Sequence, residues 1–217
     1  MGGMRPLPDL STISKTYDYV DEHGHVVFQV VRYDPKAFRV RRPAGQGEWV
    51  WEDIRHTRRL LYRLPEVIRA QTVVILEGEK DADTLRQLPG FPGDWAATSA
   101  PFGAGQWRSQ YSEMLRGKTV YICPDTDRAG MRHSLEVSND MLGKVPKLAI
   151  IRLPSGKDLA EWVQAGGTVG KFMDLVHQAQ PVQHYRLDRD ETSTRVKVTS
   201  VANPPRTKDT AAKEKQA

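Results

Sequence analysis

From residue 70 onward, short apolar runs alternate with helix-like segments, and this alternation constrains the fold more than any other feature. Residues 72–76 (TVVIL) are dominated by β-branched side chains, which is typical of a parallel strand buried on both faces. The other predicted strands span residues 95–99, 119–123 and 147–153. The predicted helices span residues 79–88, 106–115, 128–145, 159–165 and 169–178. Because strand and helix alternate, we expect an α/β domain over residues 70–180, with a parallel sheet flanked by helices.

Residues 1–69 have a different pattern, that of short antiparallel strands. The predicted strands span residues 16–20, 26–33, 38–42 and 49–51, with turns at 21–24 and 43–47. Apolar and basic residues alternate from Phe38, so we expect a small β-rich subdomain with one cationic face. The chain becomes polar at its end, so residues 181–217 are predicted to be a largely disordered tail, with a marginal hairpin over 185–201.

Composition narrows the class of protein. The single cysteine, Cys123, excludes an internal disulfide framework and a Cys-rich zinc ribbon, and it favours a reducing compartment, the cytoplasm. The chain has no apolar run of about 18 residues, so we expect neither a membrane span nor a membrane partner. Residues 36–63 carry eight basic side chains against three acidic ones. Such a cationic segment favours a polyanionic partner such as nucleic acid.

Carboxylates follow three of the four strands predicted for the α/β domain. Glu77 and Asp81 come after the first strand, Asp125 and Asp127 after the third, and Asp158 after the fourth. Ligands of open α/β sheets bind at the carboxyl ends of the strands, so these side chains are expected to converge. Convergent carboxylates repel one another unless a hard cation lies among them, and Mg²⁺ suits that position. The chemistry indicated is phosphoryl transfer.

Each of these carboxylates also has a structural interpretation. An acidic residue after a strand is favourable at the N-terminus of the helix that follows, as for Glu77. Asp127 and Asp158 could be the N-caps of their helices. The sequence leaves both interpretations open.

The same residues carry a family resemblance. Residues 74–81 (VILEGEKD) resemble the first motif of the TOPRIM domain, and residues 125–130 (DTDRAG) resemble its Asp-x-Asp motif. Residues 156–158 (GKD) are similar to a later acidic position found in primases. The resemblance covers roughly residues 70–165, and it implies a Rossmann-like TOPRIM fold.

The segment upstream resembles the region that precedes TOPRIM in phage and plasmid-type DNA primases. The similar stretches are residues 17–21, 29–33, 41–43 and 61–66, and residues 101–107 resemble a small-residue loop of the same proteins. The implied function is a primase-type nucleotidyl transferase, which makes short RNA primers on single-stranded DNA in phage or mobile-element replication. The zinc-binding and helicase domains common in that family have no counterpart motifs here, so we expect a replicative helicase to be a separate partner.

The resemblance also implies roles for individual residues. Glu77 would be the general acid or base near the reacting 3′ hydroxyl and could touch metal, and Asp125 and Asp127 would bind Mg²⁺ or Mn²⁺. Asp158 would lie at a second metal, and Asp81 would organise the turn or a metal-bound water. The residues expected at the phosphates of nucleoside triphosphates are Lys80, Lys157, Gly103 and Gly105, with solvated lysines as the alternative for the first two.

The template is expected to cross the cationic face of the N-terminal subdomain. The candidates for contacts with its phosphates are Arg39, Arg41, Arg42, Arg58 and Arg59. Trp49 and Trp51 share one face of a predicted strand, and they could stack on unpaired bases or belong to a hydrophobic core.

Two other functions compete with the primase interpretation. A TOPRIM nuclease would use the same carboxylates to hydrolyse phosphodiesters. A non-catalytic nucleic-acid-binding module of the replication machinery would need none of them. The presence of Glu77, Asp125 and Asp127 together counts against that last alternative.

Overall fold

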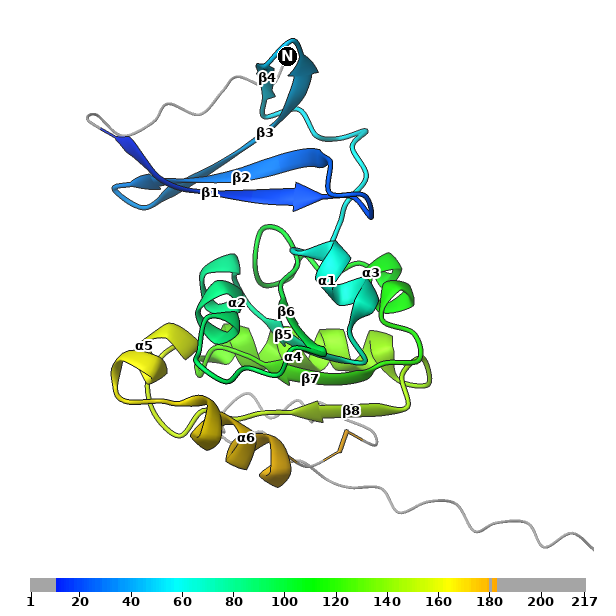
Figure 1. Cartoon of the computed structure of the whole chain (residues 1–217), viewed down its shortest axis with the longest axis vertical. Helices are drawn as coiled ribbons and strands as arrows, with labels where there is room; N and C mark the ends of the chain where they lie inside the picture. The colour runs from blue at the N-terminus through cyan, green and yellow to red at the C-terminus, as the bar shows by residue number, and fades with distance from the viewer. Residues whose placement is uncertain (1–10, 180, 183–217) are drawn as a thin grey trace, which may run out of the picture. The chain divides into compact units, whose positions relative to one another are not determined.

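A computed structural model of the chain describes residues 11–179 and 181–182. The predicted hairpin at residues 185–201 and nearly all of the predicted tail lie outside these residues. The described part belongs to one compact unit, which ends at Val182. It contains two sheets, one antiparallel and one parallel (Figure 1).

The first sheet is an antiparallel meander of four strands. Its strands are β1 (Thr12–Val20), β2 (Val26–Asp34), β3 (Ala37–Gly45) and β4 (Glu48–Trp51), paired in chain order. The expected β-rich subdomain is therefore present, with longer strands than the sequence predicts. In particular, β3 runs through most of the turn predicted at 43–47. Only Gln46 and Gly47, with φ of 52° and 84°, form the reversal itself.

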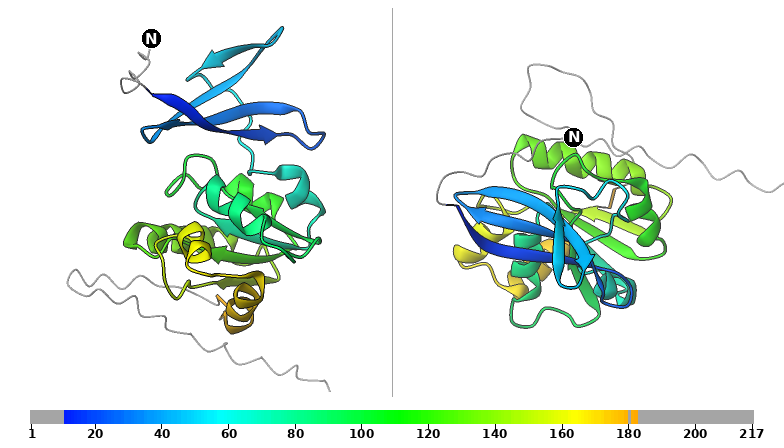
Figure 2. Two further views of the ribbon diagram at one scale, coloured as in Figure 1. Left: turned by 60° about the vertical axis from the view of Figure 1, so that its left-hand side comes forward. Right: turned by 90° about the horizontal axis from the view of Figure 1, so that it is seen from above.

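The second sheet is the predicted four-stranded parallel sheet. Its strands are β5 (Thr72–Leu76), β6 (Trp95–Thr98), β7 (Thr119–Cys123) and β8 (Lys147–Ile150), in the spatial order β6-β5-β7-β8. The helices around it are α1 (Leu64–Arg69), α2 (Glu79–Arg86), α3 (Ser109–Met114), α4 (Arg128–Met141), α5 (Leu159–Gln164) and α6 (Val169–Gln178) (Figures 1 and 2). Two central strands buried on both faces explain the continuous apolar runs in the sequence. The α/β fold class is confirmed.

One helix was not predicted, and two others differ from their predicted bounds by three residues or more. The sequence does not predict α1, because Pro65 reads as a breaker there. In the structure Pro65 lies in the first turn of α1, where a missing N–H is tolerated. The predicted helix 106–115 begins three residues late, at Ser109. The predicted helix 128–145 stops at Met141, since Gly143 adopts a positive φ of 77° just beyond it.

One hydrophobic core joins the two sheets. Tyr17 and Tyr19 on β1 and Phe28 on β2 are buried, and they cluster with Tyr62 from the connection to α1. The rings of Tyr19 and Phe28 stack with centroids 4.4 Å apart. Leu60, in the same connection, is fully buried in this core. The inner face of the meander is thus packed against the α/β part of the same unit.

Helix length and composition also bear on membrane insertion. Within the described part of the chain, no helix combines the length and the apolar character needed to cross a lipid bilayer.

Candidate active site at the carboxyl edge of the parallel sheet

Glu77 and Asp125 come off the two central strands of the parallel sheet. Leu76 on β5 pairs with Cys123 on β7, so both carboxylates follow the last paired residues at the same edge. Gly130, in the first turn of α4, packs directly against them. A Cβ atom at this position would lie 2.6 Å from the Asp125 carbonyl oxygen and 2.9 Å from Oε2 of Glu77. The close approach of α4 therefore requires glycine at residue 130.

The electrostatics show that the predicted carboxylates are neighbours. Burial, followed by the negative charges of Glu77, Asp81, Asp158 and Asp127, raises the pKa of Asp125 to about 7. Burial and then the charge of Asp127 raise the pKa of Glu77 as well. The structure therefore brings all five acidic candidates into one cluster, which we call the acidic edge.

Three members of the acidic edge also cap helices. Oδ1 of Asp127 accepts a hydrogen bond from the Gly130 amide at 2.8 Å at the start of α4. At the start of α5, Oδ1 of Asp158 accepts from Glu161 N at 2.8 Å, and Oδ1 of Asp81 accepts from Ala160 N at 3.0 Å. Asp127 and Asp158 are thus helix N-caps, as the structural interpretation expects. A carboxylate has two oxygens, so each side chain can also accept a further partner through its other oxygen.

The acidic edge has features of a site for a hard divalent cation. Within the described part of the chain, Oε2 of Glu77 is buried and has no hydrogen-bond partner. A buried anionic oxygen without a partner is costly unless a cation compensates it. All the donors are carboxylate oxygens, the kind Mg²⁺ prefers. Among residues 11–179 and 181–182, however, no three His, Cys, Asp or Glu side chains are arranged to hold a metal ion as they stand. Binding would therefore require the side chains to adjust.

The phosphate-binding candidates are partly engaged within the protein. Nζ of Lys80 lies 4.0 Å from Oδ2 of Asp158, beside the acidic edge. The backbone of Lys157 joins the loops after β7 and β8, since its carbonyl accepts a hydrogen bond from Thr126 N at 2.9 Å. Gly103 and Gly105 have positive φ, and Gly105 N donates to Nδ1 of His133 at 3.1 Å.

His133 was not identified from the sequence as a functional residue. It lies on α4, is buried and holds the loop after β6 through Gly105. Burial lowers the pKa of its imidazole, which agrees with a neutral ring whose Nδ1 accepts a hydrogen bond. A helical histidine has no sequence signal for this role, because its partner is 28 residues away.

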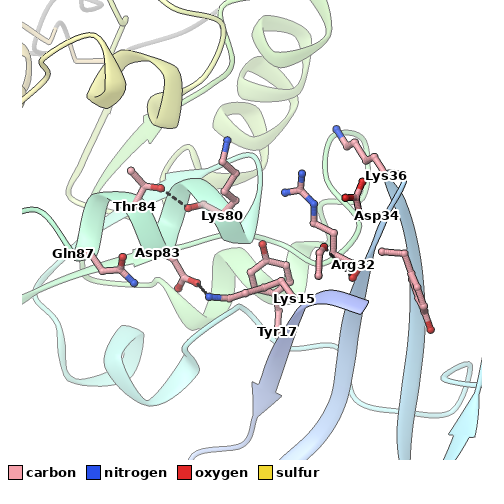
Figure 3. Close-up of a pocket in the computed structure, with 11 residues that line it drawn as sticks. Lys15, Tyr17, Arg32, Asp34, Lys36, Lys80, Asp83, Thr84 and Gln87 are labelled. Atoms are coloured by element: carbon pink, nitrogen blue, oxygen red, sulfur yellow. Dashed lines mark hydrogen bonds and ion pairs between the residues drawn. The ribbon is translucent and has the colours of Figure 1, made fainter. Parts of the chain in front are cut away.

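The sequence also missed a cavity of about 490 Å³ between the β1–β2 strands and α2 (Figure 3). Four cationic side chains line it, Lys15, Arg32, Lys36 and Lys80, together with the acids Asp34 and Asp83. Since Lys80 lines the cavity and also lies 4.0 Å from Asp158, the cavity adjoins the acidic edge. The sequence signal that could have indicated this cavity is the charged stretch at residues 32–36 (RYDPK).

The tryptophans and Arg41 form a stack on the meander. Arg41 pairs with Trp51 across β3 and β4, and Pro43 pairs with Trp49, so these side chains share one face. The guanidinium of Arg41 lies 4.3 Å from the Trp49 ring centroid and 5.1 Å from that of Trp51. Nε of Arg41 also donates to Oε1 of Gln29 at 2.6 Å. Both tryptophans are half-buried, so each retains accessible surface.

The other candidate arginines have partners within the protein. Arg58 forms a two-point ion pair with Glu22, Arg39 lies 3.7 Å from Glu52, and Arg42 donates to the Asp53 carbonyl at 3.0 Å. The guanidinium of Arg59 lies near the rings of Phe28 and Phe102. Arg39, Arg41 and Arg42 thus lie on β3, whereas Arg58 and Arg59 lie in the connection between β4 and α1.

The solved structures to which the chain is similar are catalytic domains of primases. No protein-family profile and no curated protein matches the sequence. The similarity to solved structures, at 22% identity or less, establishes the fold alone: one antiparallel and one parallel sheet, as in primase catalytic domains.

Three of these structures illustrate the similarity. The primase fragment of the bacteriophage T7 primase-helicase is 22% identical, with a TM-score of 0.56, over 74% of this chain and 61% of that one. The DnaG primase catalytic domain bound to single-stranded DNA is 20% identical, with a TM-score of 0.57, over 77% and 52%. The Aquifex aeolicus primase, with its zinc-binding and RNA polymerase domains, is 18% identical, with a TM-score of 0.58, over 76% and 40%. The chain thus spans between two fifths and three fifths of these three proteins.

Proposed function

We propose that this protein is a primase-type nucleotidyl transferase with a TOPRIM site, which makes short RNA primers on single-stranded DNA. The observation that carries the proposal is the acidic edge, where burial and then four neighbouring carboxylates raise the pKa of Asp125 to about 7. A protein maintains such repulsion at a functional site, where a cation and a polyphosphate substrate relieve it. The fold likeness to primase catalytic domains supports the same choice.

The acidic residues have distinct proposed tasks. Glu77 takes the proton of the attacking 3′ hydroxyl, because burial and the charge of Asp127 make its carboxylate more basic than an ordinary glutamate. Asp125 and Asp127 would hold Mg²⁺ or Mn²⁺, with Asp158 contributing to a second site and Asp81 orienting the α2–α5 contact. When bound, the metal would neutralise charge on the triphosphate.

The basic cavity beside α2 is the proposed site for the triphosphate. Lys80 links it to the acidic edge, and Lys15, Arg32 and Lys36 supply further positive charge. Lysine binds phosphate as a point charge and arginine as a planar fork, so the set suits a flexible polyphosphate. Lys157, Gly103 and Gly105 remain proposed contacts of the triphosphate.

The template is proposed to pass over the meander. Arg41 with Trp49 and Trp51 combines a cation with two aromatic rings, the combination that binds single strands without regard to sequence. One similar structure is a DnaG domain bound to single-stranded DNA, and another is the primase part of a primase-helicase. A replicative helicase is accordingly the proposed partner, in phage or mobile-element replication within the cytoplasm.

The test is incorporation of labelled nucleoside triphosphates on single-stranded DNA with Mg²⁺ or Mn²⁺. Glu77→Gln and Asp125→Asn remove one charge each from the acidic edge while preserving side-chain size. Asp174→Asn, at an exposed position on α6, is the matched control. Template-dependent oligoribonucleotides from the wild type and the control, lost in both acidic-edge variants, would support the proposal.

Two other results would each replace the primase proposal with another function. Metal-dependent degradation of the template, abolished by the same two variants, would mean a nuclease. DNA binding with neither synthesis nor degradation would mean a binding module of the replication machinery.

A further inference from the structure

Phe102 is an exposed aromatic residue in the loop that follows β6. Its side chain is 45% exposed, one of four large hydrophobic residues of the described part of the chain that are exposed to this degree. Its backbone has φ of 73°, in the left-handed region that non-glycine residues rarely adopt. The residues around it are Pro101, Gly103, Ala104 and Gly105, so the ring is the only large side chain of this stretch, residues 101–105.

The guanidinium of Arg59 lies over this ring. The guanidinium of Arg59 lies 5.3 Å from the Phe102 ring centroid and 5.9 Å from that of buried Phe28. Among the described residues, Nη1 of Arg59 is buried and has no hydrogen-bond partner. Contacts with the two rings therefore hold this guanidinium against Phe102.

The loop is held at the acidic edge. Gly105 N donates to Nδ1 of His133 at 3.1 Å, which fixes the loop to α4 about one turn beyond Gly130. Gly130 is the residue packed against Glu77 and Asp125. Because β6 is parallel to β5 and β7, the loop after it emerges at the same edge as both carboxylates. In Figure 1 it rises from β6 on the side that faces the meander.

These observations indicate that the Phe102 ring serves to bind a ligand and not to stabilise the fold. A glycine would adopt this φ without strain, and the exposed ring adds little to the core. Strained conformations of non-glycine residues persist mainly where the side chain has a function. A half-exposed aromatic ring backed by a guanidinium is the platform on which unpaired bases stack. We infer that Phe102 binds an unpaired base of single-stranded DNA beside the acidic edge.

The inference deepens the proposed function, since the strand at this position would be the template. Stacking alone does not depend on catalysis, however, so it can be measured separately. The full-length chain is titrated into a single-stranded oligonucleotide carrying one 2-aminopurine, with EDTA and without nucleotides. Stacking quenches the fluorescence of this base, and the titration gives the dissociation constant.

Four variants make the measurement decisive. Phe102→Ala and Phe102→Gly are expected to weaken binding about tenfold, the lower range for loss of one stacked base. Phe102→Trp keeps a ring and should bind within about twofold of the wild type. Ile68→Ala removes another hydrophobic side chain that is 46% exposed. Ile68 lies on α1, which precedes β5 and so lies at the opposite edge of the sheet. This variant should leave the affinity for DNA unchanged.

The melting temperature separates binding from folding. Phe102→Gly should not melt below the wild type, because glycine relieves the positive φ. Wild-type affinity in Phe102→Ala would overturn the inference, as would a loss of affinity matched by a lower melting temperature in Phe102→Gly. Weaker binding of free nucleotide with unchanged DNA binding would also overturn it.

The two proposals fail separately. If the wild type incorporates no nucleotide but the Phe102 variants lose DNA affinity, the primase proposal fails and the stacking site stands. If incorporation proceeds and all Phe102 variants bind DNA as the wild type does, the primase proposal stands and the stacking site fails.

Discussion

Two aspartates on α2, Asp81 and Asp83, show how differently the two sides of one helix use negative charge. Both are buried, with 8% and 7% of their surfaces exposed. Asp83 faces cations and a hydroxyl: Arg63 lies 2.8 Å away, Tyr62 donates at 3.0 Å, and Lys15 lies at 3.7 Å. Asp81 faces the acidic edge, where burial and then the charge of Asp158 raise its pKa.

The charge of Asp83 stabilises the fold, whereas the charge of Asp81 does not. The environment of Asp83 ties α2 to β1 and to the segment before α1 through compensated ion pairs. The environment of Asp81 gathers carboxylates whose mutual repulsion opposes folding. A protein loses stability by such an arrangement, so its retention indicates a function.

The largest effect is expected from Asp125→Asn at the acidic edge. If Asp125 binds the catalytic metal, nucleotide incorporation should fall about a thousandfold or more. The same change removes a repelling charge, so the metal-free variant should melt at a higher temperature than the wild type at pH 8. A variant that is both inactive and less stable would contradict this account of the acidic edge.

The next largest effect should come from the opposite side of α2. Asp83→Ala leaves Arg63 and Tyr62 without their acceptor in a buried setting. Loss of one partner from a buried ion pair costs about 3 kcal/mol of unfolding free energy. Urea unfolding measures this loss, and Asp174→Asn is the control for removal of an exposed acid. A loss no greater than that of the control would refute the stabilising role of Asp83.

The dependence of stability on pH should also reflect the acidic edge. The pKa of Asp125 is about 7 in the folded protein, above that of an unfolded aspartate. The folded state therefore binds more protons than the unfolded state between these values, and stability falls as pH rises toward 7. The metal-free wild type should melt at a higher temperature at pH 6 than at pH 8, and Asp125→Asn should reduce that difference. Added Mg²⁺ should stabilise the wild type more than the variant at pH 8.

A smaller loss is expected from Gly130→Ala. Its Cβ would lie 2.6 Å from the Asp125 carbonyl and 2.9 Å from Oε2 of Glu77, so α4 must shift. Overpacking of this kind costs about 1–3 kcal/mol, and the shift should also reduce nucleotide incorporation. Gly170→Ala on α6 is the matched control, because a Cβ there would lie 3.9 Å from Oγ1 of Thr168, an ordinary contact distance. Equal behaviour of the two variants would show that the contact at Gly130 is not restrictive.

The smallest effect is expected at the exposed ion pair between Glu22, in the β1–β2 turn, and Arg58, in the connection after β4. Glu22 accepts two hydrogen bonds from Arg58, which lower the pKa of its carboxyl to about 2. Both side chains are exposed, so water and salt screen the pair. Glu22→Gln should leave the melting temperature nearly unchanged. A marked drop would mean that exposed charges hold this fold together as strongly as buried ones do.

Much of the fold was predictable from local patterns. The strands at 72–76 and 119–123 and the helix at 169–178 have the predicted bounds, because β-branched runs and helical periodicity depend on near neighbours. The helix opened by Pro65 was missed because proline ends one element and begins another with the same local signal. The convergence of Glu77, Asp125 and Asp158 followed from strand polarity alone.

The sequence by itself determined the alternation of strands and helices and the edge of the sheet at which its acidic residues collect. Only the tertiary structure decided that Asp81 faces carboxylates while Asp83, two residues later, faces Arg63. It likewise decided that Lys15 and Arg32 line a cavity with Lys80. The physical reason is distance along the chain. Periodicity reports what a residue does to its neighbours, whereas charge pairing and cavities depend on segments that meet only after the sheets have packed.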